Sequence, residues 1–404
     1  MSALRPAREP RGESTRPWLA ENWYRLNGPR RVAGLDLARG LAVIGMFAAH
    51  LLWIDPFDPS DLSTWTDVAN GRSSILFATL AGISIALLTG GRTPVSGVAR
   101  ERASARLALR ALCIWVIGVL LILTQVPVYV ILPAYAILFL LTLPLLRARP
   151  TVLFALAAGL GLVLPWVQAL INDWPFWETQ LGGEIGLLIG INYPFTVWFA
   201  FIVAGLGVGR LDLRALRVQV CLTLAGAALA VVAYTLAVAF PATPDTYASF
   251  VWTADPHSDG MLEVFGSGGF AITVVGVCLL LMRPWWKASG STASWLGPIG
   301  WVTLPLRAVG SMPLTAYAGQ IVAWSLLQPA PSPGESTLEA FRDVDPFVPF
   351  VFWTVVLCTL WALLVGRGPL EWVLDRVARL VGRRLRVEPH AVETTQQGVD
   401  RVGQ

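Results

Sequence analysis

The feature that most constrains this chain is a series of apolar stretches, each about twenty residues long, that recurs between residues 35 and 366. A helix needs about 20 apolar residues to cross the hydrocarbon core of a bilayer. Of all residues 55% are hydrophobic and only 14% are charged, a composition typical of membrane proteins. We therefore predict an all-α polytopic membrane protein with about ten transmembrane helices. The stretches are residues 35–54, 73–90, 107–126, 128–146, 151–171, 186–209, 218–240, 260–282, 307–327 and 347–366.

Loops rich in basic residues alternate with loops poor in them along the chain. Loops after even-numbered spans carry most of the arginines, whereas loops after odd-numbered spans contain only Arg72 and Arg342. Cytoplasmic loops of membrane proteins are enriched in lysine and arginine. The pattern predicts that the arginine-rich loops and both chain termini are cytoplasmic, in a cell inner (plasma) membrane.

The same pattern divides the chain into three regions. Residues 1–33 are predicted to be a basic cytoplasmic tail, and residues 34–366 a single transmembrane domain. Residues 367–404 begin as a basic amphipathic helix and end in a polar stretch that we expect to be disordered. Such a helix suits an anionic inner leaflet, so membrane lipids are expected partners.

Motifs of soluble cofactor chemistry are missing from the sequence. It contains no P-loop, no GxGxxG after a strand, no HExxH and no CxxC pair. The four cysteines all fall within predicted spans and lack metal-ligand spacing. We expect no metal and no nucleic-acid partner, because the arginines are explained by topology.

The first predicted span carries a polar stripe. Asp36, Arg39 and His50 are each expensive to bury in lipid. At about 100° per residue, Arg39 and His50 return to within about 20° of one direction and lie about 16 Å apart along the helix. Such residues usually face a protein interior or a wet cavity. The alternative is that the two charges anchor the interface and His50 is a packed histidine.

Further polar residues are expected near the two ends of that stripe. Asn70 and Arg72 open the second span on the predicted outer side, close to His50. Asp255 and His257 lie in an outer loop before the eighth span, where His257 could equally be a solvated loop histidine. Arg307 opens the ninth span from the inner side.

Several segments resemble transmembrane acyltransferases of the YeiB-like and heparan-α-glucosaminide N-acetyltransferase-like families. The first is LDLARG at residues 35–40, in which ten residues separate Arg39 from His50. The others are FATLAGISIALL at 77–88, PHSDGMLEVFGSGGFA at 256–271 and GSMPLTAYAGQ at 310–320. The resemblance implies a transferase that uses cytoplasmic acyl-CoA, acetyl-CoA by default, to acylate a hydroxyl or amine of an extracytoplasmic sugar or glycolipid.

The resemblance also implies roles for individual residues. His50 would act as general base or acyl carrier, since imidazole titrates near neutral pH. The 16 Å rise along the first span matches a pantetheine arm to within a few ångströms. We expect Asp36 to orient an arginine. The expected phosphate-binding arginines are Arg39, Arg307, Arg106 and Arg110; the expected helpers of His50 are Asp255 and His257; the expected acceptor-pocket residues are Asn70, Arg72 and Trp53.

The competing class is a transporter or lipid or glycan flippase without covalent chemistry. Ten spans, buried charges and a sixth span interrupted by Pro194 fit that class. Against it, the sequence shows no clear inverted repeat, and its charges concentrate on the first span. Consumption of acyl-CoA would separate the two classes. The sequence leaves a homodimer open.

Overall fold

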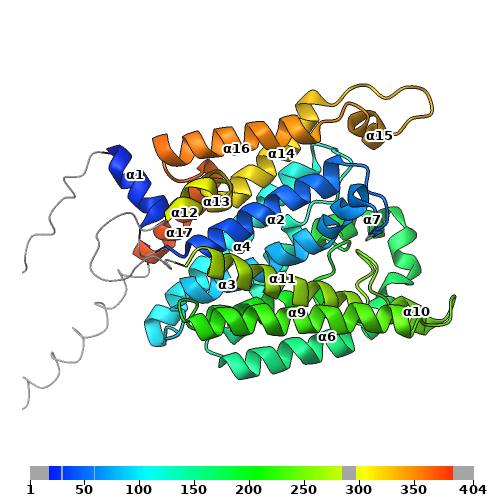
Figure 1. Cartoon of the computed structure of the whole chain (residues 1–404), viewed down its shortest axis with the longest axis horizontal. Helices are drawn as coiled ribbons and strands as arrows, with labels where there is room; N and C mark the ends of the chain where they lie inside the picture. The colour runs from blue at the N-terminus through cyan, green and yellow to red at the C-terminus, as the bar shows by residue number, and fades with distance from the viewer. Residues whose placement is uncertain (1–17, 29–30, 59, 284–296, 385–404) are drawn as a thin grey trace, which may run out of the picture.

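In the computed structural model, residues 18–28, 31–58, 60–283 and 297–384 are described (Figure 1), and within these ranges the chain forms helices and loops without a strand. Three short 3-10 turns join the α-helices. The helices are α1 (Trp18–Asn27), α2 (Ala33–Leu51), α3 (Arg72–Leu88), α4 (Gly97–Ile122), α5 (Leu132–Leu141), α6 (Pro150–Asn172), α7 (Gln180–Ile189), α8 (Phe195–Gly209), α9 (Leu216–Ala239), α10 (Tyr247–Val251), α11 (Met261–Leu281), α12 (Gly297–Val302), α13 (Leu304–Ser311), α14 (Pro313–Leu327), α15 (Thr337–Arg342), α16 (Phe347–Leu364) and α17 (Pro369–Arg384).

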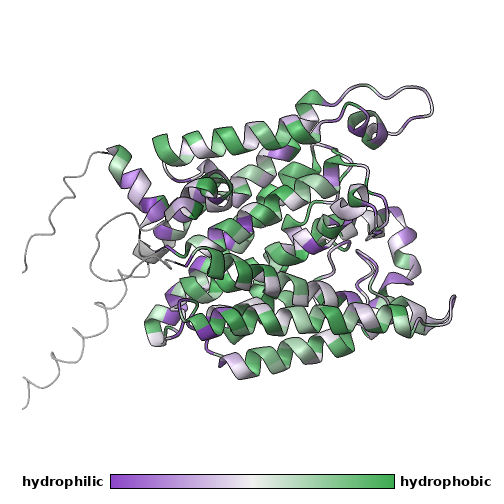
Figure 2. Cartoon of the chain, viewed as in Figure 1, coloured by the Kyte–Doolittle hydropathy of each residue, from purple (hydrophilic) through white to green (hydrophobic). Residues whose placement is uncertain are grey.

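Seven helical segments in the described ranges are long and apolar enough to cross a bilayer. They contain α2, α3, α4, α6, α9, α11 and α16, and α5, α7 and α8 are shorter apolar helices. Figure 2 shows apolar residues along the whole bundle. The prediction of an all-α polytopic membrane protein is confirmed, and each of the ten predicted spans contains helix.

Two of the predicted spans are interrupted near their start. The sixth is split into α7 and α8, because Gly190 takes the left-handed conformation (φ 69°) and Pro194 precedes α8. The ninth is split into α13 and α14 at Met312, directly before Pro313. A residue before proline is disfavoured in the helical conformation, which explains this break.

Helix α2 lies in the middle of the bundle, packed against α3, α11 and α13 (Figure 1). Its backbone touches that of α13. A Cβ on Gly310 would lie 1.7 Å from the carbonyl oxygen of Asp36, and one on Gly40 would lie 2.1 Å from that of Leu306. Only glycine fits at these two positions, so the LDLARG glycine has a packing role. We call the two ends of α2 the Arg39 end and the His50 end (left and right in Figure 1).

The predicted C-terminal amphipathic helix is α17, which packs on α4 and α14. Its Glu371 accepts hydrogen bonds from the backbone N–H groups of Leu314 (2.8 Å) and Thr315 (3.2 Å). These groups belong to the first turn of α14 and have no partner within the helix, so Glu371 caps it. Most of the predicted basic tail and the predicted disordered end after residue 384 lie outside the described residues.

Candidate active site

A cavity of about 610 Å³ lies at the His50 end of α2. It brings together His50 and His257, which are far apart in the sequence. This is the convergence that the sequence predicts. The cavity is lined by Met46, Ala49, His50, Asn70, Ser74, Pro127, Val128, Tyr129, Ile131, Asn172, Trp177, Ile191, Asn192, Tyr193, His257, Asp259, Tyr317, Leu338 and Arg342.

The imidazole of His50 contacts two side chains of α14. Its Nδ1 lies 3.4 Å from the side-chain oxygen of Gln320, and its ring centroid is 6.4 Å from that of Tyr317. An amide oxygen can only accept, so this contact requires the tautomer with the proton on Nδ1. His50 Nε2 then carries a lone pair and can take a proton from a group bound in the cavity.

The loop before α11 is held in an unusual conformation by a buried carboxylate. His257 (φ 64°) and Asp259 (φ 56°) both adopt left-handed backbone angles, which are uncommon for residues other than glycine. Glu263 accepts hydrogen bonds from the backbone N–H groups of His257 and Asp259, both at 2.7 Å, and from the Ser258 hydroxyl at 3.0 Å. Glu263 is 3% exposed. It therefore positions both side chains that this loop contributes to the cavity.

Asp259 is a cavity residue that the sequence analysis missed. Its Oδ1 accepts a hydrogen bond from the indole Nε1 of Trp198 (3.0 Å). Burial and the nearby carboxylate of Glu263 raise the pKa of Asp259 well above its usual value, while burial lowers the pKa of His257. Both shifts favour the neutral forms of these two side chains.

Among the residues predicted around His50, the cavity contains Asn70 and His257 but not Arg72, Trp53 or Asp255. Arg72 donates to the Tyr234 hydroxyl (2.8 Å) and to the carbonyl oxygen of Asp67 (2.9 Å), so it ties α3 to α9. Trp53 is 54% exposed, and Asp255 accepts from the hydroxyl of its neighbour Thr253 (2.7 Å). These three residues shape the surroundings without lining the cavity.

Other missed cavity residues are Arg342, Asn192 and Tyr193. Arg342 donates to the carbonyl oxygens of His50 and Ala49, both at 3.2 Å, and thereby caps the C-terminus of α2. The sequence offered one indication of this role, because Arg342 is a single arginine in a loop rich in acidic residues. Asn192 and Tyr193 stand next to Pro194 at the break between α7 and α8, a pattern already visible in the sequence.

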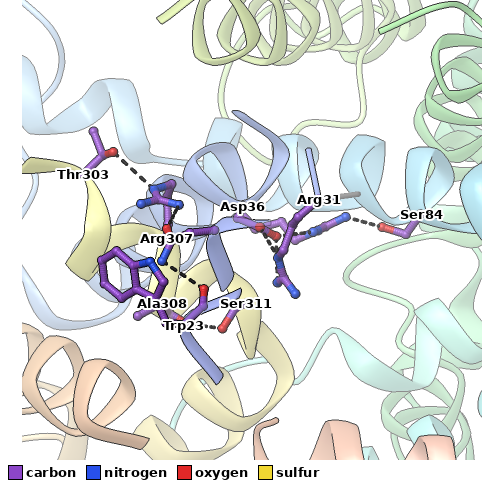
Figure 3. A network of polar contacts seen from close by, with 10 residues as sticks. Trp23, Arg31, Asp36, Ser84, Thr303, Arg307, Ala308 and Ser311 are labelled. Atoms are coloured by element: carbon purple, nitrogen blue, oxygen red, sulfur yellow. Dashed lines mark hydrogen bonds and ion pairs between the residues drawn. The ribbon is translucent and has the colours of Figure 1, made fainter. Parts of the chain in front are cut away.

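At the Arg39 end, Asp36 is the centre of an ion-pair network (Figure 3). It is 2% exposed and accepts hydrogen bonds from Arg31 and from Arg39 (3.0 Å). Arg39 also donates to the Ser84 hydroxyl on α3 (2.9 Å). The expected pairing of Asp36 with an arginine is thus present, and the pairing lowers the cost of burying the charges.

Arg307 is fully buried beside this network (Figure 3). Its guanidinium donates to the side chain of Asn27 (3.0 Å), to the carbonyl oxygen of Gly300 (2.7 Å) and to the hydroxyl of Thr303 (3.3 Å). All three nitrogens therefore have protein partners. These contacts favour a structural role for Arg307 over the expected contact with a phosphate.

Arg106 and Arg110 line a different cavity, of about 280 Å³, between α4 and α17. Arg367 and Arg379 line it too, and the carboxylate of Asp375 pairs with both Arg110 and Arg367. Four guanidinium groups around one carboxylate make a strongly basic pocket. Arginine binds phosphate in a bidentate manner, so this pocket suits a phosphate group. We call it the basic cavity.

The face of α2 between Arg39 and His50 is packed, because Val43 and Met46 on that face are buried in the core. A half-buried stripe runs instead along α3, through Phe77, Ala81 and Ser84. The stripe continues to Leu88 and Thr89 at the basic cavity, and Ser74, one turn before Phe77, lines the His50 cavity. Helix α3 therefore contributes residues to both cavities, with a rise of about 21 Å from Ser74 to Leu88.

The comparison with known families supports the resemblance seen in the sequence. A family described as "Heparan-alpha-glucosaminide N-acetyltransferase, catalytic" matches residues 31–236, just over half of the chain. The chain belongs to this family. The match includes α2 with its polar stripe, the stripe on α3 and the α4 residues Arg106 and Arg110, and it ends before the His257 loop. No curated protein matches the chain in sequence.

Membership of this family makes the chain a transmembrane acetyltransferase-type protein. Within the described residues, no group of three or more histidine, cysteine, aspartate or glutamate side chains is arranged to hold a metal ion. The polar side chains that line the His50 cavity carry imidazole, carboxyl, amide, hydroxyl and guanidinium groups. Such groups suit proton transfer to and from a reacting hydroxyl or amine.

Proposed function

We propose that the protein transfers an acyl group, acetyl by default, from cytoplasmic acyl-CoA to a hydroxyl or amine of an extracytoplasmic glycan. The observation that carries this proposal is the cavity in which His50, His257 and Asp259 meet. It lies at one end of α2, while arginines gather at the other. In this proposal the Arg39 end and both termini face the cytoplasm, the His50 end faces outward, and residues 34–366 form the catalytic domain.

The donor is proposed to bind at the Arg39 end. Its phosphates would pair with Arg106 and Arg110 in the basic cavity, assisted by Arg367. Its pantetheine chain would follow α3, where Arg39 reaches Ser84, and its thioester would enter the His50 cavity near Ser74. This route replaces the path along α2, because Val43 and Met46 fill that path.

The chemistry proposed for the cavity is direct acyl transfer. The acceptor oxygen or nitrogen attacks the thioester carbonyl carbon while His50 Nε2 takes the acceptor proton. The carbon–sulfur bond then breaks, and the imidazolium returns its proton to the leaving thiolate. Hydrogen-bond donors in the cavity, including the carboxylic acid of Asp259 and the guanidinium of Arg342, would stabilise the oxyanion that forms. Acylation of His50 itself is the alternative order of events.

Purified protein in nanodiscs, mixed with labelled acetyl-CoA and a glucosaminide, tests the proposal. Wild-type protein should consume acetyl-CoA, and His50→Ala should lower the rate by about 10²–10⁴-fold, the range of general-base catalysis. Binding of coenzyme A, measured by calorimetry, should be unchanged in the variant because the phosphates bind at the far end. Full transfer by His50→Ala would refute the assigned role.

The broken helices favour one competing function, transport of a lipid or glycan. Discontinuous helices, such as α7 with α8 and α13 with α14, mark substrate sites in many transporters. A transporter has no reason to bind coenzyme A. A protein that moves a glycan across the nanodisc membrane without binding coenzyme A would support this second function.

A further inference from the structure

A second cavity, of about 660 Å³, lies directly beside the His50 cavity. We call it the side cavity. Both cavities fall in the range of about 300–1,000 Å³ that is usual for small-molecule sites. They adjoin each other, so we treat them together as one space; the six lining residues that they share are Pro127, Val128, Tyr129, Asn192, Tyr193 and Leu338.

The two parts of this space differ in chemistry. Beyond the shared residues, the side cavity is lined mainly by aliphatic side chains such as Leu123, Val126 and Leu187, with Gln125 as its one further polar side chain. The His50 cavity has two histidines, a carboxyl and a guanidinium. The combined space is therefore amphipathic: polar at His50 and apolar at its side.

The side cavity reaches the apolar surface of the bundle between α4 and α7. Leu123 is 70% exposed, Tyr129 58% and Leu187 41%. The indole Nε1 of Trp115 on α4 donates to the carbonyl oxygen of Leu188 on α7 (3.0 Å), which links the two helices. In the membrane orientation proposed above, exposed aliphatic side chains at this place would meet lipid chains, and the opening would be lateral.

We propose that the natural acceptor is an amphiphile, a sugar carried on an alkyl or polyprenyl chain. The sugar occupies the His50 cavity, and the first part of the chain occupies the side cavity and leaves toward the bilayer between α4 and α7. This inference rests on the proposed acyl transfer and narrows its acceptor. A free sugar would leave the aliphatic wall without a partner, whereas an apolar chain gains free energy by leaving water for it.

The test compares two acceptors with the same sugar, dodecyl and methyl α-D-glucosaminide, in nanodiscs with acetyl-CoA. Wild-type protein should show a KM at least about tenfold lower for the dodecyl glycoside, because several methylene groups are buried. Leu187→Trp fills the side cavity and should remove most of this difference. Leu188→Trp is the matched control: Leu188 is 39% exposed and lines neither cavity, so the difference should persist.

Equal KM values for the two glycosides in wild-type protein, or the same behaviour of both variants, would overturn the proposal. A separate readout does not need catalysis. A dodecyl glucosaminide with a diazirine at the chain end should label peptides covering residues 122–130 and 187–190, and Leu187→Trp should suppress this labelling. Labelling spread evenly over the surface would refute the side cavity as the chain site. Failure to consume acetyl-CoA with correct labelling would refute the acyl transfer alone.

Discussion

The two ends of α2 carry polar groups in opposite circumstances. At the Arg39 end, Asp36, Arg39 and Arg307 find their partners within the protein and are closely packed. At the His50 end, polar side chains from several helices and loops face a cavity. The comparison teaches that ionisable residues on one membrane helix do not share one role. An ionisable side chain has a structural role where its hydrogen-bond partners belong to the protein, and it is available for reaction where it faces a cavity. The type of residue matters less than these surroundings.

The largest effect on stability is expected at the Arg39 end. Arg307→Leu would leave the Asn27 side chain and the Gly300 carbonyl oxygen buried without their donor, so unfolding should become easier by about 3 kcal/mol. Thermal unfolding in detergent measures this loss. Arg342→Leu at the His50 end is the matched variant and should cost less, because Arg342 is only half-buried. Equal losses of stability in the two variants would contradict the proposed difference between the Arg39 end and the His50 end.

The next largest effect is expected on catalysis, from the Glu263 carboxylate that holds the His257 loop. Glu263→Gln places an N–H₂ group where a carboxylate oxygen accepts a backbone N–H, so the left-handed loop should shift. We expect kcat to fall by about 10–100-fold, corresponding to one or two lost hydrogen bonds, with KM for acetyl-CoA unchanged. Ser258→Ala keeps both backbone contacts and should retain most activity. A rise in KM for acetyl-CoA with unchanged kcat would argue against positioning.

A smaller effect is expected in the basic cavity. Arg110→Ala should raise the KM for acetyl-CoA about tenfold, the value of one charge-assisted phosphate contact, and should make binding less sensitive to salt. Arg92→Ala is the control, because Arg92 makes an exposed ion pair with Asp212 (2.9 Å) away from that cavity. An unchanged KM in Arg110→Ala would argue against phosphate binding in the basic cavity and in favour of binding near Arg39.

The smallest effect concerns the pH dependence of stability. Because burial raises the pKa of Asp259, the folded protein binds this proton more tightly than the unfolded chain. Stability from Asp259 is therefore complete below its unfolded pKa of about 3.9 and is lost as pH rises through the folded pKa. Asp259→Asn should show a smaller fall in melting temperature between pH 5 and pH 8 than wild-type protein.

His257 contributes with the opposite sign. Its lowered pKa makes stability rise with pH up to about 6.5, its unfolded value. This contribution is common to the wild-type protein and Asp259→Asn, so the difference between their curves reports Asp259 alone. Parallel curves would show that Asp259 is ionised in both the folded and the unfolded protein.

Much of the fold could be predicted because a bilayer demands long apolar helices, and all ten predicted spans contain helix. The meeting of His50 with His257 could be predicted from topology, since the end of the first span and the loop before the eighth span lie on the same predicted side of the membrane. Asp259 could not, because its direction depends on left-handed angles at His257 and Asp259 that only the Glu263 contacts explain. Arg307 looked like a ligand-binding charge because one of its partners, Asn27, comes from a distant segment, and the bond to the nearby Gly300 carbonyl oxygen depends on the fold of the chain before α13.

The contact between Gly40 and Gly310 limits how this protein can move. No side chain separates the backbones of α2 and α13 at these glycines. Sliding one helix along the other would therefore bring larger residues into a steric clash with the facing backbone. The histidine and the buried arginine are therefore mounted on one rigid frame. Any rearrangement that admits a long donor must therefore take place in the surrounding helices, among which α4 and α17 line the basic cavity.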